Sequence, residues 1–243
     1  MRRIVLQPAY VLHRRLYRET SFLVEIFTKE YGRLTVIAKG ARKAKSSMQG
    51  LLQPFIPLYI SFVGNGELMT LSQVEMNGVA RFLRGECLFT GFYLNELLMR
   101  LTQKWDAQPG IYLAYERTLM MLQPGNVEQK TLRTFEKYLL EELGYGLLPK
   151  TDALLSAAFL PDCYYQFYFE KGFVLSDVKQ FSSMPMNLFL GKHLLAMAKD
   201  DWQGEEVLRD AKRLMRLVFT TLLGERPLYS RKLFTHDDRW GLE

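Results

Sequence analysis

Residues 21–50 read SFLVEIFTKEYGRLTVIAKGARKAKSSMQG and contain two strand-like runs followed by a basic loop. Residues 21–27 and 33–38 are rich in β-branched and aromatic side chains, and Gly32 suits the turn between them. Residues 39–50 contain four cations, two glycines and no apolar periodicity, which is typical of an exposed, mobile loop. This stretch therefore predicts two paired strands with a basic loop at their end.

Three further strand-like runs surround this stretch. Residues 10–16 precede it, and residues 54–63 and 67–76 follow it, separated by Gly64-Asn65-Gly66, whose tolerance of positive φ suits a hairpin. Five short strands and one long loop match a small closed barrel, and the OB-fold is the commonest nucleic-acid binder of that size. An SH3-like barrel would fit almost as well. We predict an OB-fold domain in residues 1–80.

From Glu86 onward the apolar period changes to that of a helix. The pattern predicts helices in residues 86–101, 111–122, 126–143, 185–198 and 205–223, with Gly144 and Gly224 at two of the ends. Residues 164–169 and 173–178 flank a Glu-Lys-Gly turn and predict a hairpin. The predicted fold class is α+β: an N-terminal OB-fold β-barrel, then a mainly α-helical domain in residues 81–243 with a small hairpin-like insertion near 160–180.

The positive charge of the chain is concentrated in its first third. Residues 1–80 contain eleven Lys and Arg against five Asp and Glu, whereas residues 81–243 contain twenty-one of each. A localised excess of this kind favours contact with a polyanion. The apolar stretches are too short for a membrane span, and the N-terminus lacks the apolar core of a signal peptide. We therefore expect a cytoplasmic protein without a membrane partner.

No pattern of catalytic residues accompanies this charge. Phosphate-binding, dinucleotide-binding and nucleophile-elbow motifs are missing from the sequence, and its three histidines have no metal-ligand spacing. Its two cysteines, Cys87 and Cys163, exclude a zinc site of the CxxC type. Adjacent acidic pairs such as Glu141-Glu142 are more often solvated than metal-binding. We expect neither enzymatic activity nor a cofactor or metal.

A cluster of cations marks the candidate binding site. Arg33, Lys39, Arg42, Lys43 and Lys45 lie within thirteen residues, and Arg14 and Arg15 come from a neighbouring strand. Cations that neutralise phosphates release counterions, so such a cluster binds nucleic acid in a salt-sensitive way without reading sequence. A loop kept charged for solubility is the alternative. Further cations (Arg2, Arg3, Arg18) and possible stacking aromatics (Tyr10, Tyr17, Tyr31, Phe55, Tyr59) favour the binding site.

A series of short stretches, in this order, resembles the RecO family of recombination mediators over approximately residues 8–234. The resemblance rests on Glu19-Thr-Ser21, Gly32-Arg33, Ala38-Lys-Gly-Ala-Arg42, Leu52-Gln-Pro-Phe55, Gly91-Phe-Tyr-Leu-Asn-Glu-Leu-Leu98, Arg133-Thr-Phe-Glu136, Leu143-Gly-Tyr145 and Ser230-Arg-Lys-Leu-Phe234. It implies an N-terminal OB-fold and a helical C-terminal domain. It also implies binding of single- and double-stranded DNA, annealing of complementary strands, and loading of RecA together with RecR.

The resemblance also implies roles for particular residues. The DNA contacts would be Arg33, Lys39, Arg42, Lys43 and Lys45, and the acidic tail of single-stranded-DNA-binding protein would meet Arg133 with its neighbours Lys130 and Lys137. Some relatives carry four zinc-binding cysteines after the position of Tyr145, where this chain has only Cys163. The predicted hairpin must then be held by packing. From charge and fold class alone, an RNA-binding barrel protein of translation or ribosome assembly stays an alternative, and a protein-only adaptor is disfavoured by the basic first third.

Overall fold

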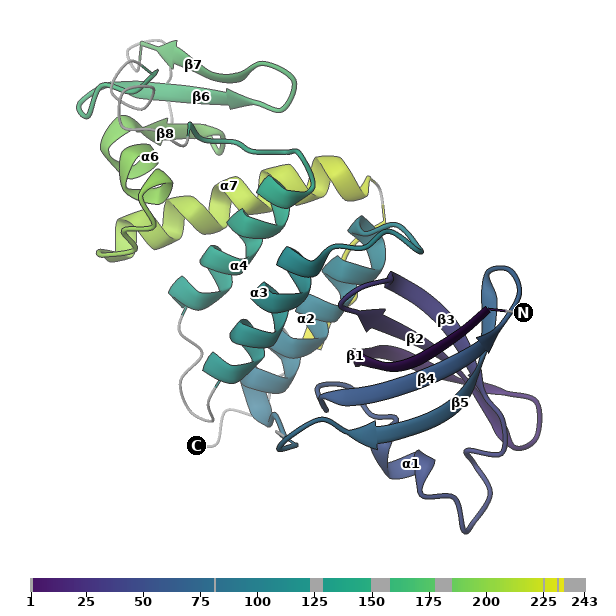
Figure 1. Ribbon diagram of the computed structural model, residues 1–243. Coiled ribbons are helices and arrows are strands. Elements are labelled where there is room, and N and C mark those ends of the chain that lie inside the picture. Colours follow the sequence, from purple (N-terminus) through teal and green to yellow (C-terminus); the bar gives the residue numbers. More distant parts are fainter. Residues whose placement is uncertain are drawn as a thin grey trace, which may run out of the picture. The chain divides into compact units, whose positions relative to one another are not determined.

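The computed structural model describes residues 2–80, 82–122, 129–149, 158–177, 185–224, 226–230 and 232–233. The chain forms two compact units. The first unit comprises residues 1–127 and returns for residues 228–243, and the second comprises residues 128–227. Each unit has its own strands and helices (Figure 1).

Five strands of the first unit form a closed barrel in the order β1-β2-β3-β5-β4. They are β1 (Arg2–Tyr17), β2 (Ser21–Thr28), β3 (Gly32–Ala38), β4 (Leu58–Gly64) and β5 (Leu68–Met76). Neighbouring strands are antiparallel except β3 and β5, which pair in parallel from Thr35–Leu68 to Ile37–Thr70. The predicted strands are present. The run predicted from residue 54 begins only at Leu58, because Pro54 and Pro57 lack the N–H groups that a strand needs.

The long strand β1 closes the barrel. Its first half pairs with β4, and its second half pairs with β2. The register shifts between Ile4 and Gln7, where Leu6 has a φ of 50°, and again between Val11 and His13. Such bulges bend a strand and increase its twist, which lets one strand serve two neighbours around a small barrel. The prediction for residues 10–16 found only the second half of this strand.

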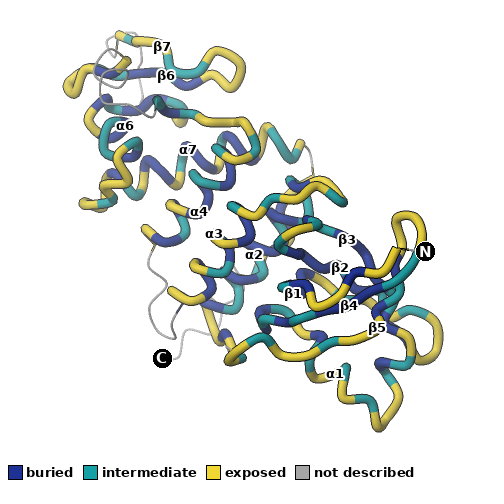
Figure 2. Tube along the Cα trace, in the orientation of Figure 1, coloured by how far each residue is buried: buried dark blue, intermediate teal, exposed yellow. Residues whose placement is uncertain are grey.

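Apolar side chains fill the barrel, and the other face of each strand lies outside it. Figure 2 shows that buried and more exposed residues both occur along these strands. Val24, Ile26, Leu34 and Val36 are fully buried inside, while the residues between them in β2 and β3 face outward. Residues 39–50 are not the fully exposed loop that the sequence predicts. Ala41 is fully buried in the barrel core, and the segment ends in a short helix, α1 (Met48–Leu51), whose following residue Leu52 is also buried.

Two helices of the first unit, α2 (Gly85–Leu101) and α3 (Pro109–Met121), pack on the barrel through a buried polar link. The Asn95 side-chain amide of α2 donates to the Leu12 carbonyl oxygen of β1 at 2.9 Å. The same amide accepts a hydrogen bond from the Tyr115 hydroxyl of α3. These bonds satisfy polar groups that would be costly to bury unpaired, so they fix β1 relative to both helices.

The segment between α2 and α3 covers one end of β3. The Trp105 amide donates to the Arg33 carbonyl oxygen at 2.8 Å, and the Lys104 ammonium donates to the Thr35 hydroxyl at 2.9 Å. Gly32 has a φ of 65°, and a Cβ atom there would lie 1.8 Å from the Asp106 carbonyl oxygen. A glycine is therefore required at this point for two reasons, backbone conformation and space.

Residues 228–230 return to the first unit through one carboxylate. Glu96 of α2 accepts hydrogen bonds from the backbone amides of Tyr229 and Ser230, at 2.9 and 2.8 Å, and from the Ser230 hydroxyl at 2.6 Å. Charge-assisted bonds of this kind are stronger than neutral ones. Glu96 thus anchors the far end of the chain to α2.

The second unit contains the helices α4 (Gln129–Glu142), α6 (Gly191–Ala198) and α7 (Glu205–Leu223). Helix α7 spans the predicted range, and α4 and α7 pack together. The predicted N-cap of α4, Asn126, lies outside the described residues. His193 of α6 contacts Asp210 of α7, with 2.8 Å between Nδ1 and Oδ2, so this histidine joins two helices of the unit.

A small three-stranded sheet in the order β7-β6-β8 completes the second unit. The predicted hairpin is present as β6 (Tyr164–Tyr168) and β7 (Gly172–Ser176), although Val178 lies outside the described residues. Aromatic rings in edge-on or tilted contact hold the sheet without cysteines: Phe159, Tyr165, Phe167, Phe173 and Phe189.

The prediction of a helix over residues 185–198 is wrong for the residues before Gly191. Residues Leu188–Leu190 form β8, which pairs with β6 and buries Leu188 and Phe189. The helix begins only at Gly191, where a Cβ atom would lie 2.0 Å from the Leu160 carbonyl oxygen. Sheet pairing and this close approach override the local helical pattern.

Candidate nucleic-acid interface

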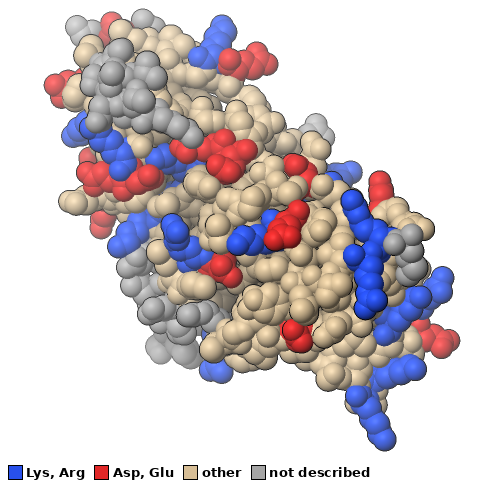
Figure 3. Space-filling model, viewed as in Figure 1, with Lys and Arg blue, Asp and Glu red and all other residues tan. Residues whose placement is uncertain are grey.

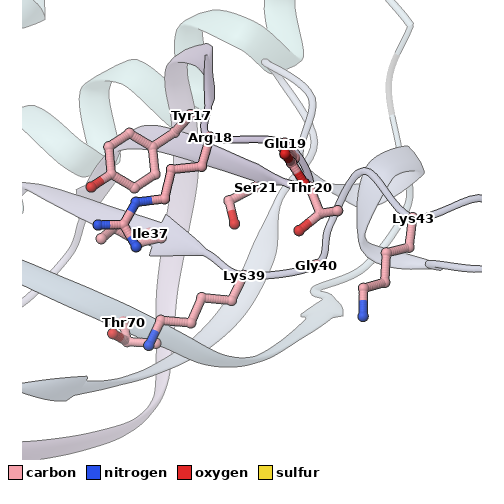
Figure 4. Close-up of a pocket in the computed structure, with 10 residues that line it drawn as sticks. All are labelled: Tyr17, Arg18, Glu19, Thr20, Ser21, Ile37, Lys39, Gly40, Lys43 and Thr70. Atoms are coloured by element: carbon pink, nitrogen blue, oxygen red, sulfur yellow. The ribbon is translucent and has the colours of Figure 1, made fainter.

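A pocket of ≈ 1020 Å³ lies on the outside of the barrel, next to the β1–β2 turn. Figure 4 shows the ten residues that line it. They come from the ends of β1 and β2 and the turn between them, from β3 and the segment after it, and from β5: Tyr17, Arg18, Glu19, Thr20, Ser21, Ile37, Lys39, Gly40, Lys43 and Thr70. Three are cations and one is an acid, so the lining is positively charged.

Strand register brings together Ile37 and Thr70, which both line the pocket. Leu23 pairs with Ile37, and Ile37 pairs with Thr70, so one outward row runs across β2, β3 and β5. Arg15 of β1 pairs with Leu23 and extends this row. Tyr17 lies two residues beyond Arg15 and therefore on the same face of β1. The row joins residues that are more than fifty positions apart in the sequence.

Lys39, Lys43 and Lys45 are exposed to solvent in the segment after β3. Gly40, with a φ of 68°, turns the chain between the first two, and the aliphatic part of Lys43 lies near it, 3.7 Å from the position of a Cβ atom. Arg15 and Arg18 are also exposed, at the end of β1 and in the following turn. Figure 3 shows Lys and Arg side chains gathered over the barrel, with few acidic side chains among them.

Three other predicted DNA contacts have their guanidinium groups bound within the protein. Arg14 donates to the carbonyl oxygens of Gln49 and Leu52, at 3.0 and 2.9 Å, at the end of α1. Its guanidinium also lies over the Phe22 ring, 4.9 Å from the centroid. Arg14 therefore satisfies helix-end carbonyls that have no partner within α1.

Arg33 joins β3 to the segment after α2. Its guanidinium donates to the Thr102 carbonyl oxygen at 2.9 Å and forms an ion pair with Glu25 at 3.3 Å, and its side chain is only 14% exposed.

Arg42 supports the β1–β2 turn. Its backbone amide donates to the Thr20 carbonyl oxygen at 2.9 Å, and its guanidinium donates to the Arg18 carbonyl oxygen at 3.1 Å. As DNA contacts, Arg14, Arg33 and Arg42 stay predictions.

Arginines and lysines thus have different positions in the predicted cluster. The guanidinium group has five donors in a planar fork and bridges backbone carbonyls well, whereas the ammonium group is compact and strongly hydrated. Sequence reasoning treated all seven cations alike. It named Arg18 only among further cations and Tyr17 only among possible stacking aromatics, although a Tyr-Arg-Glu-Thr turn between two predicted strands was the signal that could have assigned both to the site.

The residues predicted to meet a partner tail lie on α4 in the second unit. Arg133 forms an ion pair with Glu136, and the side chains are 8% and 1% exposed. Lys137 donates to the Ala198 carbonyl oxygen and to Asp200, both at 2.9 Å. Lys130 is exposed at the start of the helix. The charge of Arg133 is therefore already balanced by a neighbouring carboxylate.

Within the described residues, no group of three or more His, Cys, Asp or Glu side chains lies close enough to hold a metal ion. None of the described helices combines the length with the apolar character that a membrane span needs.

A closed barrel with a basic pocket beside its first turn is typical of nucleic-acid-binding barrel proteins. The family model of the recombination protein O N-terminal region matches residues 1–79, and that of the C-terminal region matches residues 85–232. The chain therefore belongs to the RecO family, a family of DNA repair and recombination.

Curated relatives named "DNA repair protein RecO" match nearly the whole chain. The protein from Coxiella burnetii (strain RSA 331 / Henzerling II) is 43% identical over 232 residues, covering 96% of this chain and 98% of the relative. The protein from Cellvibrio japonicus is 42% identical over 240 residues, with the same coverage. The protein from Nitrosococcus oceani is 42% identical over 239 residues, covering 98% of this chain and 96% of the relative.

Proposed function

We propose that this chain is a recombination mediator without catalytic chemistry. It binds single- and double-stranded DNA, anneals complementary strands and, with RecR, helps load RecA on strands coated by single-stranded-DNA-binding protein. It acts in the cytoplasm, at the nucleoid. The observation that carries this proposal is the group of solvent-exposed lysines around the barrel pocket in a member of the RecO family.

The barrel is the proposed DNA-binding domain and has the character of an OB-fold. OB-folds bind oligonucleotides with the face of strands 2 and 3 and with the loop between strands 1 and 2. The pocket here is formed by the β1–β2 turn, β3 and the adjoining β5. We place this domain in residues 1–80 and the partner-binding domain in residues 81–243.

The proposed contacts to DNA phosphates are Lys39, Lys43 and Lys45, with Arg15 and Arg18 beside them. These five side chains are exposed to solvent, where they can exchange hydration for phosphate. Cations on the barrel also screen two DNA strands from each other, which removes the repulsion that slows annealing. No covalent step is required for this role.

The second unit is proposed to receive the acidic tail of single-stranded-DNA-binding protein on α4. Arg133 and Lys130 would meet the tail carboxylates, and Lys137 would hold α4 in place through Asp200. Because Arg133 is paired with Glu136, the tail must compete with that carboxylate. RecR is the second proposed protein partner.

The experiment that tests the proposal is strand annealing and DNA binding by the double variant Lys39→Ala/Lys43→Ala. Each lost phosphate contact on a single strand makes the negative slope of log K against log salt shallower by about 0.7, so a reduction in its magnitude of about 1.4 is expected. The matched control is Lys171→Ala/Lys192→Ala, which removes two exposed lysines of the second unit. Equal slopes and equal annealing rates for both variants would contradict the proposed site.

Tighter binding to RNA than to DNA of equal length would favour the RNA-binding alternative.

A further inference from the structure

Tyr17 presents an aromatic ring to the basic pocket. Among the described residues that line this pocket, Tyr17 is the aromatic one, and it is only partly buried (Figure 4). The ring lies at the end of β1, where the strand enters the turn formed by Arg18, Glu19 and Thr20. A flat, partly apolar ring thus lines a pocket whose other residues include three cations, one acid and the apolar Ile37.

The other aromatic candidates of the barrel, Tyr10, Tyr31, Phe55 and Tyr59, do not line this pocket. Tyr10 and Phe55 are 3% and 5% exposed. Tyr31 packs edge-on against Phe62, with 6.4 Å between the ring centroids. The tertiary structure therefore separates Tyr17 from four aromatic residues that the sequence could not distinguish from it.

The Tyr17 ring already has a planar group over it. The Arg18 guanidinium lies over this ring, 5.3 Å from the ring centroid, so a base that stacks on the same face takes the place of this guanidinium. Arg18 has a φ of 48°, and its carbonyl oxygen accepts a hydrogen bond from the Arg42 guanidinium. This bond stabilises the turn that positions Tyr17 and Arg18. A nucleic-acid base is a planar group of the same kind and stacks well on aromatic rings.

We infer that the pocket takes one unpaired base, which stacks on Tyr17 while its flanking phosphates meet Lys39 and Lys43. This inference rests on the proposed function, because it assumes that the pocket faces DNA. A volume of ≈ 1020 Å³ is ample for one nucleotide. A base inside a duplex has both faces covered and cannot stack on a protein ring unless it leaves the helix. The pocket therefore distinguishes single strands from double strands, whereas the lysines alone do not.

The test compares three fluorescent probes: an oligo-dT, an abasic deoxyribose-phosphate oligomer of the same length, and a blunt duplex. Tyr17→Ala is expected to weaken oligo-dT binding about 5- to 150-fold, the equivalent of about 1–3 kcal/mol for a stacked base. Binding of the abasic oligomer and the duplex is expected to stay unchanged. Tyr17→Phe, which keeps the ring, is the matched control and is expected to bind oligo-dT as the unchanged protein does.

A second readout is independent of the stability of the alanine variant. Tyr17→Trp is expected to lose additional tryptophan fluorescence, relative to the unchanged protein, on binding oligo-dT and not on binding the abasic oligomer. Equal weakening of all three probes by Tyr17→Ala, or equal quenching of Tyr17→Trp by both oligomers, would overturn the inference.

Failure of the proposed function would look different. Lys39→Ala/Lys43→Ala should weaken binding of the abasic oligomer, which carries phosphates but no bases. If abasic binding depends on the lysines but oligo-dT binding is indifferent to Tyr17, the DNA site stands and the base pocket does not. If abasic binding is indifferent to the lysines, the DNA site itself is misplaced.

Discussion

The Arg42 guanidinium donates a hydrogen bond to the carbonyl oxygen of Arg18 at 3.1 Å. Through this bond the segment after β3 supports the β1–β2 turn, and both segments line the same pocket. Arg42 therefore stabilises the shape of the pocket, while the neighbouring Lys39 and Lys43 supply its positive charge.

This relationship predicts different consequences for neighbouring cations. Arg42→Ala is expected to lower the free energy of unfolding by about 1 kcal/mol, because a hydrogen bond to the turn is lost. Lys43→Ala is expected to leave stability unchanged, since its ammonium group is in solvent. Urea unfolding followed by circular dichroism measures both. Equal stability of the two variants would show that Arg42 does not hold the turn.

Gly32 is predicted to be among the most sensitive glycines of the barrel. In Gly32→Ala the new Cβ atom would lie 1.8 Å from the Asp106 carbonyl oxygen, so the segment after α2 must move. We expect a loss of about 2–5 kcal/mol, from about 1–2 for the left-handed conformation and about 1–3 for overpacking. Gly66→Ala is the control, because Gly66 also has a positive φ but nothing within 4 Å of the new atom. Similar losses at both positions, measured by urea unfolding, would contradict the steric argument.

Glu136 is predicted to limit binding of an acidic peptide to α4. Glu136→Gln removes the carboxylate that competes for Arg133, so a peptide with an acidic, Phe-ending tail should bind about tenfold more tightly, the equivalent of about 1.4 kcal/mol. Glu142→Gln changes the same charge at an exposed position of the same helix. Fluorescence anisotropy of a labelled peptide, with its terminal Phe removed as a further control, measures the difference. An equal gain for both variants would indicate a general charge effect, and no gain would argue against Arg133 as the receiving group.

The buried Tyr115 predicts a loss of stability at alkaline pH. Burial, and then the neighbouring Tyr10 and Tyr112, raises the pKa of Tyr115 well above its ordinary value. Because the folded chain holds this proton more tightly than the unfolded chain, the contribution is fully present below about pH 10 and is lost as the pH rises further. Tyr115→Phe should therefore show a shallower fall in the free energy of unfolding between about pH 9 and 11. Tyr229→Phe, at an exposed ring, is the control and should keep the steep fall.

Much of the fold could be predicted from local pattern. The β-branched and aromatic side chains of residues 21–27 and 33–38 located β2 and β3, and helical periodicity located α2, α3 and α7. The prediction was wrong where distant pairing outweighed it. Leu188–Leu190 has a helical pattern but forms a strand, because its backbone pairs with β6 and its side chains are buried there.

The sequence by itself determined three features: the concentration of positive charge in the first third, the strand and helix patterns, and the family resemblance. Each of these depends only on residue type and on near neighbours in the chain. The tertiary structure alone decided which cations are exposed and which aromatic ring faces them. Arg14, Arg33 and Arg42 bind carbonyl oxygens that lie between 24 and 69 positions away along the chain, whereas Lys39, Lys43 and Lys45 stay in solvent. No local pattern encodes such distances, because closing the barrel is what brings these donors and acceptors together.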